Sequence, residues 1–212
     1  MDTLVAQPWP IDLQWSREKP PLAPAELSAL PDAQLMQRYQ SGDSDAFRTL
    51  YARYCDRLHR FVARLAASAG EAEEIFQEVW LAVVRDRERY TPKAKFVTYL
   101  FTIAHQRSID RWRFHRRVME EPLPESDSDL AQFVDQPQHR PDTFAQDAHS
   151  AQALLAAIAR LPLLQREAFL MQAEGKMTVE EIASATGTNR ETAKSRLRYA
   201  NKRLRSALEG LR

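Results

Sequence analysis

The stretch TVEEIASATGTNRETAKSRLR, Thr178 to Arg198, predicts two short helices joined by an abrupt turn. Thr178 can cap the first helix, and Glu181 three residues later completes a capping box. Gly187 suits the left-handed backbone of a sharp turn, and Asn189 can cap the second helix. Few folds accommodate so tight a bend between helices, so this stretch predicts a helix–turn–helix.

The second helix of this motif is cationic on one side. Its predicted buried stripe is Ala193, Leu197, Ala200 and Leu204, and the opposite face carries Arg190, Glu191, Lys194, Ser195, Arg198 and Lys202. Such a helix fits the DNA major groove, where Arg and Lys reach guanine edges or phosphates. The alternative is a solvated helix with internal ion pairs. That alternative is disfavoured because only Glu191 opposes the helix's seven cations, Arg190, Lys194, Arg196, Arg198, Lys202, Arg203 and Arg205.

A second basic segment, HQRSIDRWRFHRR, ends an earlier predicted helix. Its cations are Arg107, Arg111, Arg113, Arg116 and Arg117, opposed by Asp110, with aromatic residues interleaved. Basic residues can follow phosphates and aromatic residues can hold unstacked bases. For Tyr99 and Trp112, however, packing in the core is the favoured interpretation. Two nucleic-acid surfaces on one chain suggest two DNA elements read at a fixed distance.

The rest of the sequence predicts an all-α protein of two small helical domains. Residues 1–31 hold half of the 12 prolines and are expected to be a disordered arm. Residues 32–117 form the first domain and residues 148–212 the second. Between them, residues 118–147 are expected to be a flexible acidic linker, because Asp and Glu dominate and prolines interrupt the backbone.

Apolar spacing and capping residues place the helices of the first domain. Asp32 is expected to cap a short helix that stops at Gly42, and Asp43 to cap the next. The second helix has an apolar stripe at spacings of three and four: Phe47, Leu50, Tyr54, Leu58, Phe61 and Leu65. A third helix over 71–87 buries Ile75, Val79, Trp80 and Val83, and a fourth covers 95–117.

Several other functions are disfavoured by what the sequence contains. The single cysteine, Cys55, forms no internal disulfide, and without a Cys/His cluster a metal site is improbable. The five histidines are scattered, with no phosphate loop or nucleophile motif beside them, so we expect no catalytic residues and no cofactor. No apolar run has the length of a membrane span, so we expect no membrane insertion.

The order of four motifs carries a resemblance to a known family. DAFRTLYARY, EAEEIFQEVWLAVVR, FVTYLFTIAHQRSIDRWR and ARLPLLQREAFLMQAEGKMTVEEIASATGTNRETAKSRLR together resemble the extracytoplasmic-function (ECF) branch of bacterial sigma factors. The similarity runs from about residue 32 to 208 and leaves out the N-terminal arm. It implies a transcription initiation factor, not an enzyme, that binds core RNA polymerase, at the clamp coiled coil and the flap, and promoter DNA.

The resemblance also implies roles for particular residues. Polymerase binding falls on Glu74, Gln77, Glu78 and Leu81, which match the family's acidic-x-x-Gln-Glu-x-x-Leu pattern. Contacts to the melted −10 element fall on Lys93, Lys95, Gln106, Arg107, Arg111, Arg113, Arg116 and Arg117. Contacts to the −35 duplex fall on Arg190, Glu191, Lys194, Ser195, Arg198, Tyr199 and Lys202. Gln106 stands where the family usually has Asn, and Tyr99 replaces the common Trp.

The resemblance further implies a cytoplasmic bacterial protein that is associated with the nucleoid when active and, as is common in the family, held inactive by an anti-sigma factor. The main rival is an autonomous helix–turn–helix regulator with an N-terminal sensor or dimerisation domain. That rival predicts tight binding of the isolated protein to twofold half-sites. A sigma factor predicts weak DNA binding alone and specific binding with core enzyme.

Overall fold

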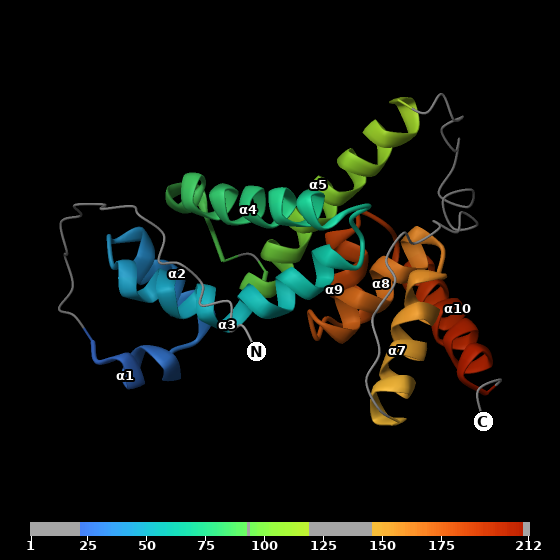
Figure 1. Ribbon diagram of the computed structural model, residues 1–212. Coiled ribbons are helices and arrows are strands. Elements are labelled where there is room, and N and C mark those ends of the chain that lie inside the picture. Colours follow the sequence, from blue (N-terminus) through green and yellow to red (C-terminus); the bar gives the residue numbers. More distant parts are fainter. Residues whose placement is uncertain (1–21, 93, 119–145, 210–212) are drawn as a thin grey trace. The chain divides into compact units, whose positions relative to one another are not determined.

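The computed structural model describes residues 22–92, 94–118 and 146–209, and every regular element within these ranges is helical (Figure 1). This confirms the predicted all-α class. The chain divides into two compact units, residues 1–50 and 51–212, each of which is described by itself. The predictions for most of the arm, for the linker over 119–145 and for Lys93 fall outside the described residues.

The N-terminal unit contains α1 (Pro24–Ala29), α2 (Asp32–Gln40) and the start of α3 (Ser44–Ala63). The helix α1 corrects the expectation that residues up to 31 form a disordered arm. Proline is tolerated in the first turn of a helix, where its missing N–H costs no bond, and Pro24 is the first residue of α1. Leu27 is buried and anchors this turn.

The cap predictions at α2 and α3 have opposite outcomes. Asp32 is not a cap: Pro31 occupies the N-cap position, and Asp32 is the first helical residue. There its carboxylate still favours the positive end of the helix dipole. Gly42, where the helix was predicted to stop, follows the C-cap of α2 and has a left-handed backbone at φ 90°. The predicted cap Asp43 is confirmed, since its Oδ1 accepts from the amides of Asp45 at 3.1 Å and Ala46 at 3.3 Å.

In the second unit the remainder of α3 packs with α4 (Ala69–Arg85), the 3-10 turn η1 (Arg87–Arg89) and α5 (Phe96–Val118). The predicted stripe of α3 is buried except for Phe47, which is partly exposed, and the four predicted core residues of α4 are buried. Aromatic pairs join the helices: Phe61 of α3 lies edge-to-face with Phe101 of α5, with 4.9 Å between ring centroids. Tyr99 was predicted to pack in the core, and the centroid of its ring lies 5.2 Å from that of Tyr90.

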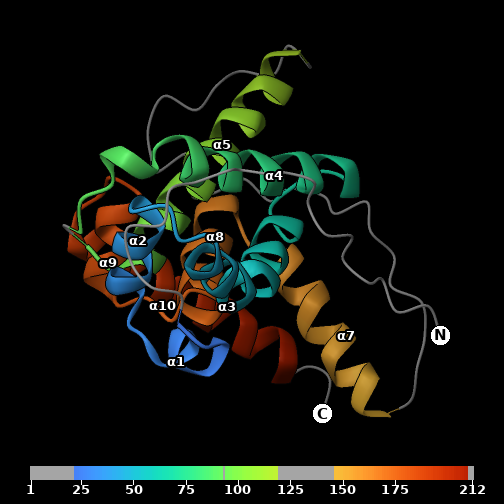
Figure 2. The ribbon, with the colours of Figure 1, turned by 90° about the vertical axis from the view of Figure 1, so that its left-hand side faces the viewer.

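The C-terminal part of this unit consists of α7 (Gln146–Ala159), α8 (Leu163–Ala173), α9 (Val179–Ala185) and α10 (Arg190–Glu209). Helix α10 packs against α7, α8 and α9, and α9 also packs against α5 (Figures 1 and 2). The two predicted helical regions therefore contact each other directly. Among the described residues, none of the helices combines the length and apolarity needed to cross a membrane.

Candidate nucleic-acid interface

The helix–turn–helix is built by α9, a turn and the start of α10. Its predicted capping box is present, because the Glu181 amide donates to Thr178 Oγ1 at 3.2 Å and the Thr178 amide donates to Glu181 Oε2 at 2.8 Å. Gly187 has the predicted left-handed backbone at φ 65°. Asn189 Oδ1 accepts from the Thr192 amide at 2.8 Å and caps α10. These local bonds fix the angle at which α10 leaves the turn.

Helix α10 buries the four residues predicted for its inner stripe and presents the predicted polar face to solvent. Six of the seven residues predicted to contact duplex DNA are exposed, and Ser195 is partly exposed. The side chain of Lys194 is 60% exposed, and its Nζ lies 4.0 Å from Oε2 of the exposed Glu191, a surface pair that a phosphate or a base edge can replace. The turn thus holds a cationic helix face that is exposed to solvent.

Ion pairs at the start of α10 make this face less positive than the count of charges along the helix suggests. Arg190 Nε donates to Glu180 Oε1 of α9 at 2.6 Å, and Arg190 Nη1 lies 3.3 Å from Glu191 Oε1. The hydrogen bond from Arg190 holds the pKa of the Glu180 carboxyl below its ordinary value. Because Glu180 belongs to the neighbouring helix, counting partners within α10 alone missed this pair.

Arg196 is 6% exposed and faces inward, so it does not add to the charge that DNA would meet. Glu180 is paired with Arg190, and Glu181 Oε1 lies 3.0 Å from Nζ of Lys95, the residue just before α5. Lys95, predicted to contact the −10 element, is thus paired with the helix–turn–helix in this structure.

Further along α10 a shallow basic depression is lined by Arg198, Asn201, Lys202, Arg205 and Ser206. The Arg198 guanidinium lies 5.0 Å from the centroid of the exposed Tyr199 ring, so the ring restricts where this cation points. Arg205 and Asn201 were not predicted as contacts. Arg198, Lys202 and Arg205 follow one another at intervals of four and three residues. From this spacing the sequence could have placed Arg205 on the same face.

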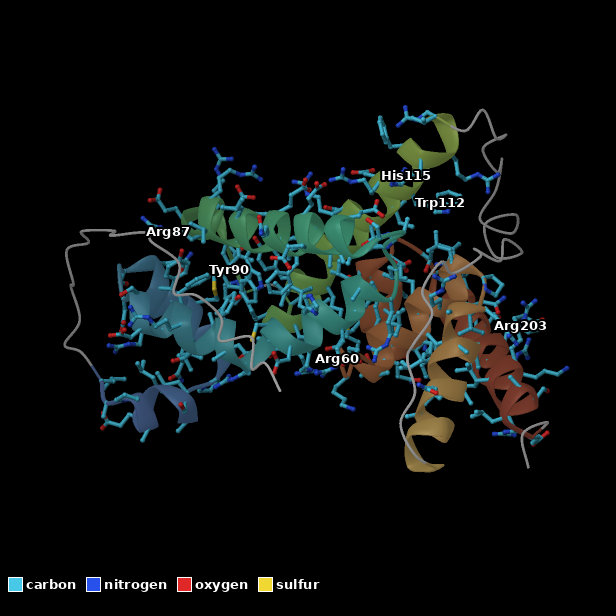
Figure 3. All side chains as sticks on the ribbon, viewed as in Figure 1. Arg60, Arg87, Tyr90, Trp112, His115 and Arg203 are labelled. Atoms are coloured by element: carbon cyan, nitrogen blue, oxygen red, sulfur yellow. The ribbon has the colours of Figure 1, made fainter. Side chains whose placement is uncertain are left out.

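The basic segment of α5 is divided between exposed and paired side chains. Gln106, Arg113 and Arg117 are exposed, as a DNA-facing role requires. Arg116 is 8% exposed, and its guanidinium lies 5.2 Å from the centroid of the Trp112 ring, so it is not part of the accessible surface (Figure 3 labels Trp112). Arg107 and Arg111 lie beside carboxylates of α4, with Arg107 Nε 3.6 Å from Glu78 Oε2.

The face of α4 predicted to bind polymerase is accessible. Glu74 and Gln77 are exposed, Glu78 is partly exposed, and the apolar side chain of Leu81 is 48% exposed. An exposed leucine beside carboxylates and an amide can bury apolar area at a partner while the polar groups form its rim. Glu78 is also an ion-pair partner of Arg107 and Arg111, so the two predicted sites share contacts.

Besides the Lys95–Glu181 pair and a bond from Arg166 Nη1 to the Arg64 carbonyl at 3.3 Å, two sets of polar contacts join the two helical regions. Glu174, just after α8, accepts from Arg57 through its carbonyl at 2.5 Å, and its carboxylate pairs with Arg60 at 2.9 Å and Arg64 at 2.8 Å. In the second set, His105 Nδ1 of α5 lies 2.6 Å from Oε1 of the buried Glu167 of α8. Within the described residues no group of three His, Cys, Asp or Glu could hold a metal ion.

The His105–Glu167 contact predicts a pH-dependent stability. Burial alone would lower the pKa of His105, but the charge and hydrogen bond of Glu167 outweigh burial and the nearby Arg196 and Arg113, so the pKa lies above 6.5. A raised pKa stabilises the folded chain below pH 6.5, and this contribution is lost as pH rises through the raised value. In urea unfolding, the free energy of unfolding should fall more between about pH 6 and about pH 9 for the native chain than for His105→Gln. Equal losses in the two proteins would contradict this assignment.

Residues 50–118 match the Sigma-70 region 2 family, and residues 151–204 match the Sigma-70, region 4 family. The chain is 31% identical over 173 residues to the RNA polymerase sigma factor CarQ of Myxococcus xanthus, covering 82% of this chain and 95% of that relative. It is 34% identical over 167 residues to the ECF RNA polymerase sigma factor RpoE of Cereibacter sphaeroides, covering 77% of this chain and 86% of that relative. The chain belongs to the ECF sigma factors.

Two solved structures share the fold of this ECF sigma factor. CnrH in complex with the cytosolic domain of CnrY has a TM-score of 0.60 at 19% identity, covering 84% of this chain and 97% of CnrH. The sigma factor RpoE in complex with the anti-sigma factor NepR from Bartonella quintana also has a TM-score of 0.60, at 22% identity, covering 77% of this chain and 96% of RpoE. The predicted family is confirmed, and with it a transcription initiation factor; the autonomous regulator is not favoured.

Proposed function

We propose that this ECF sigma factor docks on core RNA polymerase through α4, directs it to a bipartite promoter through α5 and α10, and helps to open the −10 region. In this proposal residues 32–117 act as region 2 and residues 148–212 as region 4, with the acidic segment 118–147 between them. The observation that carries it is the exposed cationic face of α10, held by a capped helix–turn–helix inside the part of the chain that matches region 4.

For the −35 duplex we assign Lys194, Ser195 and Arg198 as the main contacts. They lie on the exposed side of α10, away from the buried stripe. Lys202 and Arg205 extend the basic surface along the helix and suit phosphates, which fix register without reading sequence. Arg190 and Glu191, already paired with neighbours, are assigned to the edge of the interface.

For the −10 element we assign Gln106, Arg113 and Arg117 of α5, with Lys93 and Lys95 in or beside the preceding loop. The amide of Gln106 can bond the edge of an unstacked base, and the arginines can follow the strand's phosphates. Extruding a base costs a few kcal/mol, which contacts in a pocket offset. A factor that binds the separated strand better than the duplex shifts the equilibrium towards opening. Lys95 must leave Glu181 for this role.

The proposed partners follow from the same surfaces. Glu74, Gln77, Glu78 and Leu81 would meet the clamp coiled coil. The groove lined by Leu154, Phe169, Leu204 and Leu208, together with Asn201, Arg205 and Glu209, is the surface we assign to the flap. Nucleotide chemistry belongs to the polymerase, so the factor itself is not an enzyme, and it works in the cytoplasm on the nucleoid.

An anti-sigma factor is a further proposed partner. A solved structure of similar fold is the complex of a sigma factor with the anti-sigma factor NepR. We propose that this chain is controlled in the same way, by a protein that covers its polymerase-binding surfaces.

A gel-shift on promoter fragments, with and without core polymerase, tests the proposed function. Candidate promoters are found by in vitro transcription with this factor and sequencing of the transcript starts. Specific shifts are expected with core enzyme and only weak binding by the chain alone. Protection of a palindrome by the isolated chain at physiological salt would instead support a regulator.

A further inference from the structure

A ladder of ion pairs links α4 to α5 along one side of region 2. On α4 the carboxylates of Glu71, Glu74 and Glu78 share a face at spacings of three and four. On α5 Arg107, Arg111 and His115 share a face at spacings of four. The two faces oppose each other, since α4 packs against α5 (Figure 3 labels His115 on α5).

Arg111 is at the centre of this ladder. Its Nη2 lies 3.2 Å from Glu74 Oε2 and 3.4 Å from Glu78 Oε1, and its Nε lies 3.9 Å from Glu71 Oε1. One guanidinium thus faces three carboxylates. The planar fork of arginine can bridge several acceptors in this way, whereas the single ammonium of lysine cannot reproduce the arrangement.

Glu71 is the fixed end of the ladder. Its side chain is 9% exposed, Oε2 accepts from the Ala67 amide at 2.6 Å, and Oε1 lies 2.8 Å from His115 Nε2. The Glu71 amide in turn donates to Ser68 Oγ at the N-terminus of α4. Because Glu71 is tied to the helix cap, Arg111 is held beside a rigid anchor.

The other end of the ladder is the proposed polymerase-binding face. Glu74 and Glu78 are 63% and 42% exposed, and both would be free to rotate on a bare helix surface. Arg111 restricts them and offsets the repulsion between carboxylates on one face. For Arg111 to reach a phosphate it would have to leave all three carboxylates. Within the described residues, neither Arg113 nor Arg117 has a carboxylate this close.

We propose that Arg111 is a positioning residue for polymerase docking, which orients Glu74 and Glu78 of α4, and that it is not a contact to the −10 strand. This rests on the proposed function of α4. It reassigns a residue that both the charge pattern and the family resemblance placed on DNA. Arg107, with one carboxylate partner, supports the same face from the next turn of α5.

The test separates docking from DNA binding. Fluorescently labelled chain is titrated with core polymerase in the absence of DNA, and open-complex formation is then measured at saturating core. Arg111→Gln should weaken core binding on the order of ten-fold and leave open-complex formation within about two-fold. The matched control is Arg113→Gln, an exposed arginine on the same helix, which should leave core binding unchanged and weaken the open complex.

A double-mutant cycle excludes a merely structural effect. Once Glu74→Gln is present, Arg111→Gln should cost less core affinity than it does in the native chain, because the two side chains act on docking together. Additive effects, unchanged core binding by Arg111→Gln, or a defect confined to open complexes would overturn the positioning role. Failure of the native chain to bind core would instead overturn the proposed function itself, and this inference with it.

Discussion

Replacing Phe101 with alanine is expected to lower the free energy of unfolding by about 3–5 kcal/mol. Phe101 is fully buried, and its ring meets the fully buried Phe61 ring of α3 edge-to-face. Alanine removes the ring and leaves a cavity between α3 and α5 that close-packed neighbours fill only in part. The free energy of unfolding of a typical domain is only about 5–15 kcal/mol, so this substitution should remove a large part of it.

The same helix supplies a matched control for this prediction. Phe114 is 55% exposed, so Phe114→Ala should change the free energy of unfolding by no more than about 0.5 kcal/mol. Urea unfolding followed by circular dichroism measures both variants. If Phe101→Ala costs less than about 1 kcal/mol, the ring pair is not the core contact described above.

Removing Lys194 and Arg198 together is expected to abolish most transcription from promoters that depend on a −35 element. A good contact to a base contributes about 1–3 kcal/mol, so losing two should lower promoter affinity about a hundred-fold or more. The slope of log affinity against log salt concentration should also decrease in magnitude, by an amount that corresponds to at most about two phosphate contacts. The measurement is promoter binding and transcription by the reconstituted holoenzyme over a range of salt concentrations.

Arg203→Ala is the control for the double variant. Arg203, labelled in Figure 3, is exposed on α10. It lies nine residues from Lys194, which at about 100° per residue places it on the opposite side of the helix. Its loss should leave −35 protection nearly unchanged. Intact −35 protection in the Lys194/Arg198 double variant would contradict the assignment of this face to DNA.

The parts of the site that follow from neighbours in sequence were predictable. Thr178, Glu181 and Asn189 make their cap bonds within three residues, and the buried stripe of α10 follows from helical spacing alone. A periodic pattern is a local property, so it predicts a buried helix face without knowledge of the contacts made by distant parts of the sequence. Gly187 belongs to the same class, because its backbone conformation is set by the turn.

The pairings between elements were not predictable from charge counts. Arg111 is adjacent in sequence to Asp110, yet its partners are on α4, more than thirty positions away. Arg116 and Arg196 belong to the charge runs but are buried, since the helix face on which each lies is turned inward. A run of cations specifies how much charge is present, whereas tertiary packing decides which of it a ligand can reach.

The three arginines of α3 and the lone Glu174 opposite them form an asymmetric joint between regions 2 and 4. Loss of any one arginine leaves two donors in place, so the joint is redundant on that side. Glu174 alone among the described residues pairs its carboxylate with both Arg60 and Arg64, so its loss removes two ion pairs at once, whereas the bond from Arg57 to its carbonyl remains. Substitutions of single arginines on α3 should therefore be tolerated more readily than substitutions of this glutamate. Glu174 is thus the position at which to change how easily the two regions separate.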